Sequence, residues 1–439
     1  MTFDDAMRFI LSSSNIRFNL PYVEAKQHHH IYIDRLRSFL DILGNPERAI
    51  PHYIHVTGTS GKGSTCLFLQ HILHASGARV GTTISPHPTH ITERWTVGLN
   101  DMSQEDFTRI VKEMKPALNE HARTCPHGPP SFFEMTTAIG LYHFSQTTCD
   151  WGVIEVGCGG RYDGTNVIPY KDVAIVTNVG LDHTAILGKD KETIAYEKIG
   201  IVTPGSQLFT NERDPKIANI LSSETKRLGG TYTNTSTLEA SITDHSFDGV
   251  TFSFEDTSYK LNVLGKHQVD NALLTISAAR YVGISEEHIV EGLERTTLPL
   301  RMEVVSKEPI TILDSAHNED KILSTVNTLL SLNKDDAPIH LVVGLSSGKH
   351  VDAIIRILTR LQPASVACTR NTVNHMRKVI FPAHMCEKFK EYLPGTPIEL
   401  FLDPMDALSW SQKQAKKCDI LLITGSVFLS GELRPTLTI

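Results

Sequence analysis

The chain lacks three features that would each point to a broad class of protein. It has no excess of positive charge: 42 Lys and Arg against 49 Asp and Glu give a net charge of −7, so its bulk charge does not attract nucleic acid or an anionic membrane. Its seven cysteines contain no CxxC pair, which argues against a disulfide framework or a structural zinc site. No apolar run approaches the ~18 residues of a membrane span.

The N-terminal stretch MTFDDAMRFILSSSN also lacks the basic region and small-residue cleavage site of a signal peptide. We therefore expect a soluble cytoplasmic protein. Apolar residues make up 40% of the 439, charged residues 21%, and Gly and Pro together only 29 + 21 = 50, so disorder and collagen-like repeats are excluded. The length suggests two domains.

From Tyr53 onward, short β-branched runs alternate with amphipathic stretches of helical length, a pattern typical of βαβ units and a mostly parallel sheet. The clearest helix is 62–76. A period of two over 247–262 predicts an antiparallel hairpin at the edge of this first domain, and a helix is expected to start near His267. The expected strands are 53–57, 79–84, 153–156, 173–178 and 207–210.

A second alternating series follows Arg301. We place the linker at 296–301, which predicts a first domain over 1–297 and a second, smaller domain over 298–439, facing each other across a cleft. Both belong to the α/β fold class. The expected strands are 310–313, 339–343, 365–368, 398–401 and 420–424, and the expected helices are 321–332, 351–361, 383–392 and 405–416.

The strongest local motif is VTGTSGKGST, residues 56–65, between an expected strand and helix. Glycines let backbone N–H groups approach a phosphate, and Lys62 adds a charge for the β- and γ-phosphates. Gly63 lies between Lys62 and Ser64, so the spacing differs from GxxxxGK[ST]; a structural glycine turn is the alternative. The candidate nucleotide-binding residues are Gly58, Thr59, Ser60, Gly61, Lys62, Gly63 and Ser64.

Polar residues follow two further strands of the first domain. Glu155 ends a buried strand before a glycine-rich segment, where a carboxylate can hold a metal or cap a turn. Asp182 and His183 follow the strand at 173–178. A lone histidine is more often structural, but here Glu155 and the phosphate loop are expected nearby. Lys198, beside a glutamate, reads in isolation as a solvated helix residue.

The second domain adds two polar groups. Asp314 and His317 follow the strand at 310–313. Arg301 lies on the linker, where its planar guanidinium could reach a phosphate or form a surface salt bridge.

Together these motifs resemble folylpolyglutamate synthase and dihydrofolate synthase of the Mur ligase superfamily, from about residue 35 to the C-terminus. Two departures stand out: Ser60 replaces an Asn, and Pro299-Leu300 replaces a common Pro-Gly before Arg301. The motifs are 58–64, 85–87, 155–163, 182–183, 197–198, 267–271, 301, 314–318 and 424–426.

The resemblance implies an ATP-binding central domain and a Rossmann-like C-terminal domain on the glutamate side of the cleft. It implies roles for these residues as follows: Lys62 and Ser64 contact phosphate and Mg²⁺; Ser85, Glu155, His183 and a carbamylated Lys198 hold Mg²⁺; Asn271, Arg301 and Asp314 bind ATP; Arg161 and Asp163 contact the pterin-bearing substrate; and the catalytic residues are Lys62, Lys198, His183 and His317.

The implied reaction is ATP-dependent amide formation between L-glutamate and dihydropteroate or a reduced folate. A carboxylate attacks the γ-phosphate, and an amino group then displaces phosphate from the acyl phosphate, so positioning and charge neutralisation carry the rate. We expect small-molecule substrates, no nucleic-acid or membrane partner, and a monomer. Two alternatives remain open: a Mur-type ligase with another carboxylate acceptor, and a catalytically silent nucleotide-binding homologue.

Overall fold

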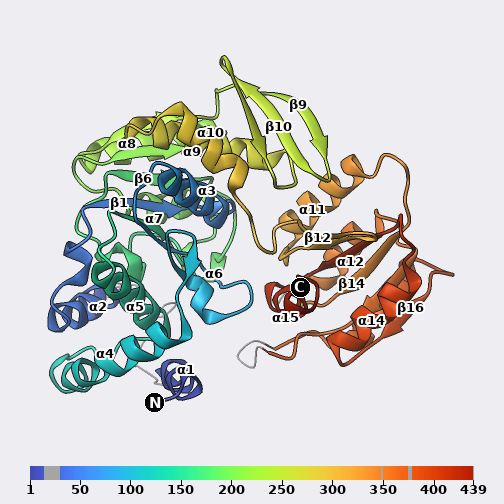
Figure 1. Cartoon of the computed structure of the whole chain (residues 1–439), viewed down its shortest axis with the longest axis horizontal. Coiled ribbons are helices and arrows are strands. Elements are labelled where there is room, and N and C mark those ends of the chain that lie inside the picture. The colour runs from blue at the N-terminus through green and yellow to red at the C-terminus, as the bar shows by residue number, and fades with distance from the viewer. Residues whose placement is uncertain (14–29, 348–349, 374–377, 439) are drawn as a thin grey trace. The chain divides into compact units, whose positions relative to one another are not determined.

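A computed structural model describes residues 1–13, 30–347, 350–373 and 378–438. The chain divides into two compact units. The first comprises residues 1–87, 91–239 and 268–296, and the second comprises 88–90, 240–267 and 297–439. The hairpin at 247–262, which we expected at the edge of the first domain, thus groups with the second unit as part of 240–267. Each unit has a sheet and helices of its own (Figure 1).

The first unit is built on an eight-stranded sheet in the order β4-β3-β2-β5-β1-β6-β7-β8. The six strands from β2 to β8 in this order are parallel, and β3 and β4 add an antiparallel edge. The strands are β1 (His52–Thr57), β2 (Val80–Thr83), β3 (Trp95–Val97), β4 (Asn100–Asp101), β5 (Trp151–Glu155), β6 (Val173–Val176), β7 (Gln207–Thr210) and β8 (Thr231–Asn234).

Helices cover both faces of this sheet: α3, α9 and α10 lie on one side and α2, α4 and α5 on the other (Figure 1). Covering both faces lets the central strands be apolar throughout, as in β6, where all four residues are buried. The helices are α1 (Phe3–Ser12), α2 (His30–Ile42), α3 (Lys62–Ala75), α4 (Gln104–Thr124), α5 (Phe132–Gln146), α6 (Thr184–Leu187), α7 (Lys191–Ile199), α8 (Pro215–Arg227), α9 (His267–Tyr281) and α10 (Glu286–Arg295).

The second unit holds a six-stranded sheet in the order β12-β13-β17-β14-β15-β16 and a three-stranded antiparallel sheet in the order β11-β10-β9. In the larger sheet only β12 runs antiparallel to its neighbour. The strands are β9 (Ser241–Ser246), β10 (Gly249–Phe254), β11 (Thr257–Leu261), β12 (Glu303–Lys307), β13 (Ile310–Leu313), β14 (Ile339–Val343), β15 (Ser365–Cys368), β16 (Ile398–Leu400) and β17 (Ile420–Thr424).

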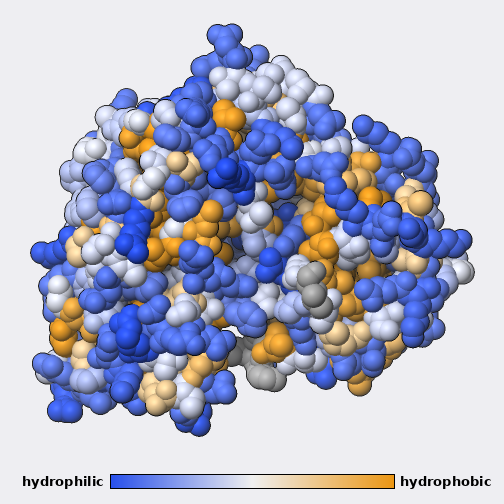
Figure 2. All heavy atoms as spheres, in the orientation of Figure 1, coloured by the Kyte–Doolittle hydropathy of each residue, from blue (hydrophilic) through white to orange (hydrophobic). Residues whose placement is uncertain are grey.

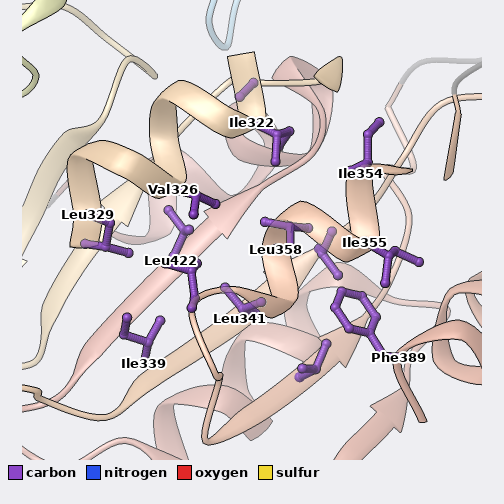
Figure 3. Close-up of a cluster of buried hydrophobic side chains, with 14 of the residues drawn as sticks. Ile322, Val326, Leu329, Ile339, Leu341, Ile354, Ile355, Leu358, Phe389 and Leu422 are labelled. Carbon is purple, nitrogen blue, oxygen red and sulfur yellow. The ribbon is translucent and has the colours of Figure 1, made fainter. Parts of the chain in front are cut away.

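Its helices are α11 (Glu319–Leu332), α12 (Val351–Thr359), α13 (Pro382–Tyr392), α14 (Pro404–Gln414) and α15 (Val427–Leu433). One face of the larger sheet carries a core of apolar side chains from α11, α12 and α13, which point toward those of β14 and β17 (Figure 3). Ile322, Leu341 and Leu358 of this core are fully buried. Burying a side chain of this size contributes about 1.5–3 kcal/mol, so the core holds the strand ends of this unit in place.

The sheets confirm the predicted α/β fold class with mostly parallel strands. The face of the molecule in Figure 2 is largely hydrophilic, with apolar residues in scattered patches. Among the helices that the structure describes, none combines the length and hydrophobicity needed to cross a membrane.

Candidate active site

The phosphate loop joins β1 to α3, as the sequence predicts. Gly58 and Gly61 have φ values of +152° and +83°, which favour glycine. A Cβ atom on Gly58 would lie 1.7 Å from Oγ1 of Thr177, and one on Gly61 would lie 2.5 Å from Oδ1 of Asn271. Both glycines are therefore needed for this loop conformation, and Asn271 of α9 borders the loop.

Hydrogen bonds from the segment after β6 hold the loop open. The backbone N–H of Ser60 donates to Oδ1 of Asn178 at 3.0 Å, and Oγ1 of Thr177 donates to the carbonyl of Ser60 at 2.6 Å. The N–H of Gly180 donates to Oγ1 of Thr59 at 2.8 Å. With the backbone of Ser60 and the side chain of Thr59 thus engaged, the loop has a fixed backbone before any ligand binds.

The start of α3 has the features of an anion site. Gly61 is its N-cap residue and supplies no side-chain cap, so the first N–H groups of the helix, at Gly63 and Ser64, can serve a phosphate. Lys62 occupies the first helical position, and its Nζ donates to the carbonyl of Gly58 at 3.1 Å. The lysine thus folds back over the loop, where it can meet a phosphate bound there.

A pocket with about 240 Å³ of empty space lies against this loop. Its wall includes Lys62, His183 and Lys198, three of the predicted catalytic residues. Asp182, Cys158, Thr57 and Thr59 complete the polar lining. His183 has a left-handed backbone, with φ of +49°, and its N–H donates to Oδ1 of Asp182 at 2.9 Å. The structure thus brings together groups from the phosphate loop, the segment after β6 and α7.

Lys198 is buried rather than solvated, with 3% of its surface exposed. Burial, together with the positive charge of Lys62, lowers its pKa to about 7, and Cys158 and Asp182 partly oppose this. Burial also raises the pKa of the Cys158 thiol to about 12. A substantial share of Lys198 is therefore a neutral amine at neutral pH, the form that can react with carbon dioxide.

Glu155 and Ser85 line a second pocket, with about 340 Å³ of empty space. The N–H of Ser85 donates to Oε2 of Glu155 at 2.7 Å. Val156, the residue after Glu155, lines the first pocket, so both pockets adjoin the end of β5. Ser64 is buried in the first turn of α3. The five predicted metal ligands thus lie within one unit, at strand and helix ends.

Among the described residues, no group of three His, Cys, Asp or Glu side chains is placed to hold a metal ion. Mg²⁺ does not need such a group, because it retains waters and binds one or two carboxylates together with the phosphates of its substrate. Glu155 offers one carboxylate, and a carbamate on Lys198 would offer a second. The donor set therefore fits Mg²⁺ held jointly with a nucleotide.

Arg161 and Asp163, the predicted substrate contacts, occupy the loop between β5 and β6. The guanidinium of Arg161 lies 3.9 Å from the ring centroid of Tyr196 and donates to that residue's carbonyl at 3.0 Å. Asp163 is buried and accepts from the N–H of Cys158 at 2.9 Å and from Oγ1 of Thr165 at 2.6 Å. In this structure its carboxylate fixes the loop.

The remaining predicted residues lie in the second unit. Asp314 follows β13 and is buried; it accepts from the N–H groups of Met302 and Ala316, both at 3.1 Å. Burial raises the pKa of this carboxyl, and these hydrogen bonds oppose the rise. Nδ1 of His317 lies 2.8 Å from the carbonyl of Ser315.

Arg301 lies between two residues with left-handed backbone, Leu300 and Met302, with φ of +58° and +52°. Such φ values are uncommon for residues other than glycine and are costly for bulky ones. Leu300 is also fully buried, and its N–H donates to Oε2 of Glu303 at 2.9 Å. Burial and hydrogen bonding hold this leucine in a strained turn that presents Arg301.

Two models of one protein family match the chain. The Mur ligase middle domain matches residues 130–279, and the Mur ligase, glutamate ligase domain matches residues 300–427. The chain belongs to the Mur ligase family. These matches cover the segments that carry Glu155, His183 and Lys198 in the first unit and Asp314 and His317 in the second.

The similar proteins described next are named as enzymes that act on folates. Their names confirm the resemblance that the motifs predicted. A dihydrofolate synthase/folylpolyglutamate synthase of Bacillus subtilis (strain 168) is 29% identical over 92% of this chain and 94% of its own length. E. coli FolC in complex with DHPP and ADP is 26% identical, with a TM-score of 0.82 over 98% of this chain and 97% of its own.

A third relative is a bifunctional folylpolyglutamate synthase/dihydrofolate synthase crystallised with Mn, AMPPNP and L-glutamate. It is 26% identical to this chain, with a TM-score of 0.79 over 99% of this chain and 98% of its own.

The sequence motifs of this Mur ligase did not identify Arg94 as a residue of the candidate site. Arg94 lines the pocket of Glu155, and its Nε donates to Nδ1 of His87 at 3.2 Å. Burial lowers its pKa to about 10, and Glu155 opposes this. Arg94 has no motif of its own; it reaches the site because the next residue, Trp95, pairs with Thr83 near the end of β2. Recognising β3 as an antiparallel neighbour of β2 would have found it.

Proposed function

We propose that this chain is an ATP-dependent ligase that adds L-glutamate to dihydropteroate, reduced folates or both, through an acyl phosphate, giving ADP and phosphate. The observation that carries the proposal is the pocket shared by Lys62, His183 and Lys198 beside the phosphate loop. The names of the related enzymes supply the acceptor class.

The residues of the first unit account for ATP binding. The N–H groups at the start of α3 and the charge of Lys62 would hold the β- and γ-phosphates. Asn271 borders the same loop. The attraction between Lys62 and the phosphates would be stronger in a pocket that excludes water, because the local dielectric constant is low. In the second unit, Arg301 and Asp314 are proposed to serve ATP, and His317 a catalytic role.

Mg²⁺ is the metal that the donor set suits, with Ser64, Ser85, Glu155, His183 and a carbamylated Lys198 as its proposed ligands. When bound, it would neutralise phosphate charge. Ser85 and Glu155 are linked by a hydrogen bond, which orients the Glu155 carboxylate before the metal arrives. Burial of Lys198 keeps a neutral amine available for carbamylation.

The acceptor would lie beside Arg161 and Asp163. Asp163 fixes the glycine-rich loop through its hydrogen bonds, and Arg161 stacks on Tyr196. We further propose that the first domain, over 1–297, binds ATP and that the second, over 298–439, contributes the glutamate side of the site. We propose the cytoplasm as the location of the protein, because all seven cysteines are free thiols, as expected in a reducing compartment. The proposed oligomeric state is a monomer.

The test is release of ADP from MgATP with different acceptors. L-glutamate plus dihydropteroate, or plus a reduced folate, is expected to give stoichiometric ADP and a product longer by one glutamyl residue, measured by mass spectrometry. ADP release with an unrelated carboxylic acid in place of the pterin compound would mean a different Mur-type ligase. Absence of release with every acid would mean a silent homologue. Light scattering after gel filtration tests the monomer.

A further inference from the structure

A third pocket of the first unit is lined by none of the residues assigned to the reaction. It has about 580 Å³ of empty space. Four segments that are distant in the sequence form it: α2, the turn 46–48 after it, the stretch 166–171 before β6, and the stretch 200–203 after α7. Its polar lining consists of Arg37, Glu47, Arg48, Asn166, Lys171 and Thr203.

Lys171 is the unusual member of this pocket. It is 4% exposed, and its Nζ donates to the neutral side chain of Asn166 at 2.9 Å. Within the described part of the chain, no carboxylate pairs with it. A buried ammonium without a counter-charge is costly. An anion bound in this pocket would therefore stabilise the charged form of Lys171.

The rest of the lining also favours an anion. Arg37 and Arg48 are half exposed or more, with 51% and 66% of their side chains accessible. Asp34 pairs with Arg37 at 3.1 Å, and Glu47 lies 3.5 Å from Nε of Arg48. Guanidinium groups keep several donors after one such contact, and their planar fork suits phosphate and carboxylate oxygens. Two arginines at the rim thus accompany a buried lysine.

We propose that this pocket is a binding site for a small oxyanion, a phosphate or a carboxylate, held by Lys171, Arg37 and Arg48. Burial lowers the pKa of Lys171 to about 7, so an anion can draw a proton onto the amine as it binds. Glu47 lines the same pocket, and burial raises its pKa. The charge of Lys171 acts on His55, whose pKa burial holds well below its usual range.

Asn166 connects this site to the loop that carries Arg161. Its Nδ2 donates to the carbonyls of Arg161 and Gly200 at 3.0 and 3.1 Å, while its Oδ1 accepts from Lys171. An anion that keeps Lys171 charged would strengthen this last hydrogen bond, because charge-assisted hydrogen bonds are the stronger ones. Hydrogen bonds thus link the site to the backbone of Arg161, one of the proposed acceptor contacts, and to that of Gly200 after α7.

The test is isothermal titration calorimetry of the full-length chain in a Lys62→Ala background, which weakens phosphate binding at the phosphate loop. The probes are sulfate and inorganic phosphate in one arm and glutarate in the other, and they distinguish a phosphate-type ligand from a carboxylate. Arg37→Ala/Arg48→Ala is expected to weaken binding of the preferred probe at least tenfold. These side chains are at the surface, so this variant should fold. Lys171→Met is expected to do the same.

Arg227→Ala/Arg295→Ala is the matched control, because these arginines are also exposed and each pairs with a glutamate on its own helix. It should change the affinity less than twofold. Sulfate keeps its charge between pH 6 and 9, so its affinity should fall as Lys171 loses its proton over that range. Binding that is unaffected by Arg37→Ala/Arg48→Ala, or absent for all three probes, would overturn the proposal.

Discussion

Lys198 and Lys171 are two buried lysines of one unit, and burial lowers the pKa of each to about 7. Their neighbours differ. Lys198 shares its pocket with Lys62, Asp182 and Cys158, and the charges of Lys62 and Asp182 also act on its pKa. For Lys171, burial is the one cause of the shift, and its hydrogen-bond partner is an amide. Burial makes the neutral amine accessible near pH 7 in both lysines, but the surrounding groups determine which reaction or ligand each lysine can support.

The two lysines should respond differently to loss of Lys62. Lys62→Ala should reduce ATP-dependent ligation by about a thousandfold or more, since the loop loses the charge that orients and neutralises the phosphates. The pKa of Lys198 should rise because a repelling charge is gone, whereas that of Lys171 should stay. ADP release measures the first effect, and NMR titration of labelled lysines measures the second.

The matched control for Lys62→Ala is Lys216→Ala, whose side chain is 72% exposed and pairs with Glu192. It should leave turnover and both pKa values unchanged. Near wild-type turnover in a folded Lys62→Ala protein would refute the phosphate-loop assignment.

A second prediction distinguishes the two lysines by how much turnover is lost when each is replaced. Lys198→Ala should lower turnover by about a hundredfold or more, because a carbamate that binds metal cannot form. Lys171→Met should lower it by less than about tenfold. Acetate or propionate should restore part of the rate to Lys198→Ala alone. Equal losses in the two variants would contradict the comparison.

The direct measurement for Lys198 is intact-site mass analysis, or a high-resolution density map, under bicarbonate. Both should show a carbamate on Nζ of Lys198. An unmodified amine together with a fully active Lys198→Ala variant would leave Lys198 with a purely structural role.

A third prediction concerns the metal. Glu155→Gln and His183→Ala should each raise the Mg²⁺ concentration needed for half-maximal turnover by about 10- to 100-fold, since each removes a proposed ligand. Lys171→Met should not change it. Glu192→Gln and His52→Ala are controls on exposed side chains of the same unit. Wild-type metal dependence in both test variants would mean that the ligands are wrongly chosen.

The sequence predicted those parts of this fold that depend on local pattern. Strands β13, β14, β15 and β17 begin and end at the predicted residues, because continuous apolar runs in a parallel sheet have clear limits. The phosphate loop was equally visible, since its glycines follow from close approach and positive φ. Strands β3, β4, β8, β9 and β12 were missed: β3 and β4 are too short to show a period, and β9 is mostly exposed.

The parts that depend on burial could not be predicted in this way. Lys198 reads as a solvated helix residue, yet the phosphate loop and Cys158 enclose it. Lys171 carries no motif, and its burial depends on segments around Arg37 and Thr203 that are remote in sequence. Likewise, nothing local shows that Leu300 takes a left-handed conformation; packing in the second unit's core imposes it.

The smallest predicted effect is a change in how stability depends on pH. The pKa of Lys171 is about 7 in the folded protein and about 10.4 in the unfolded chain. Below pH 7 both states hold the proton and the full cost of burying the charge is present. Between about 7 and 10.4 the unfolded chain binds more protons, so the free energy of unfolding should rise with pH, by at most about 1.4 kcal/mol per pH unit for each such lysine.

Lys171→Met should remove the share of this slope that belongs to Lys171, and urea unfolding at pH 7, 8 and 9 measures it. Lys216→Met is the control, because its exposed amine should leave the slope intact. Bicarbonate should steepen the remaining slope near pH 7 in Lys171→Met, since folded Lys198 held as a carbamate carries no ammonium proton whereas the unfolded lysine still does. The same slope in wild type and Lys171→Met would show that Lys171 is not a buried amine, and the contrast between the two lysines would fail.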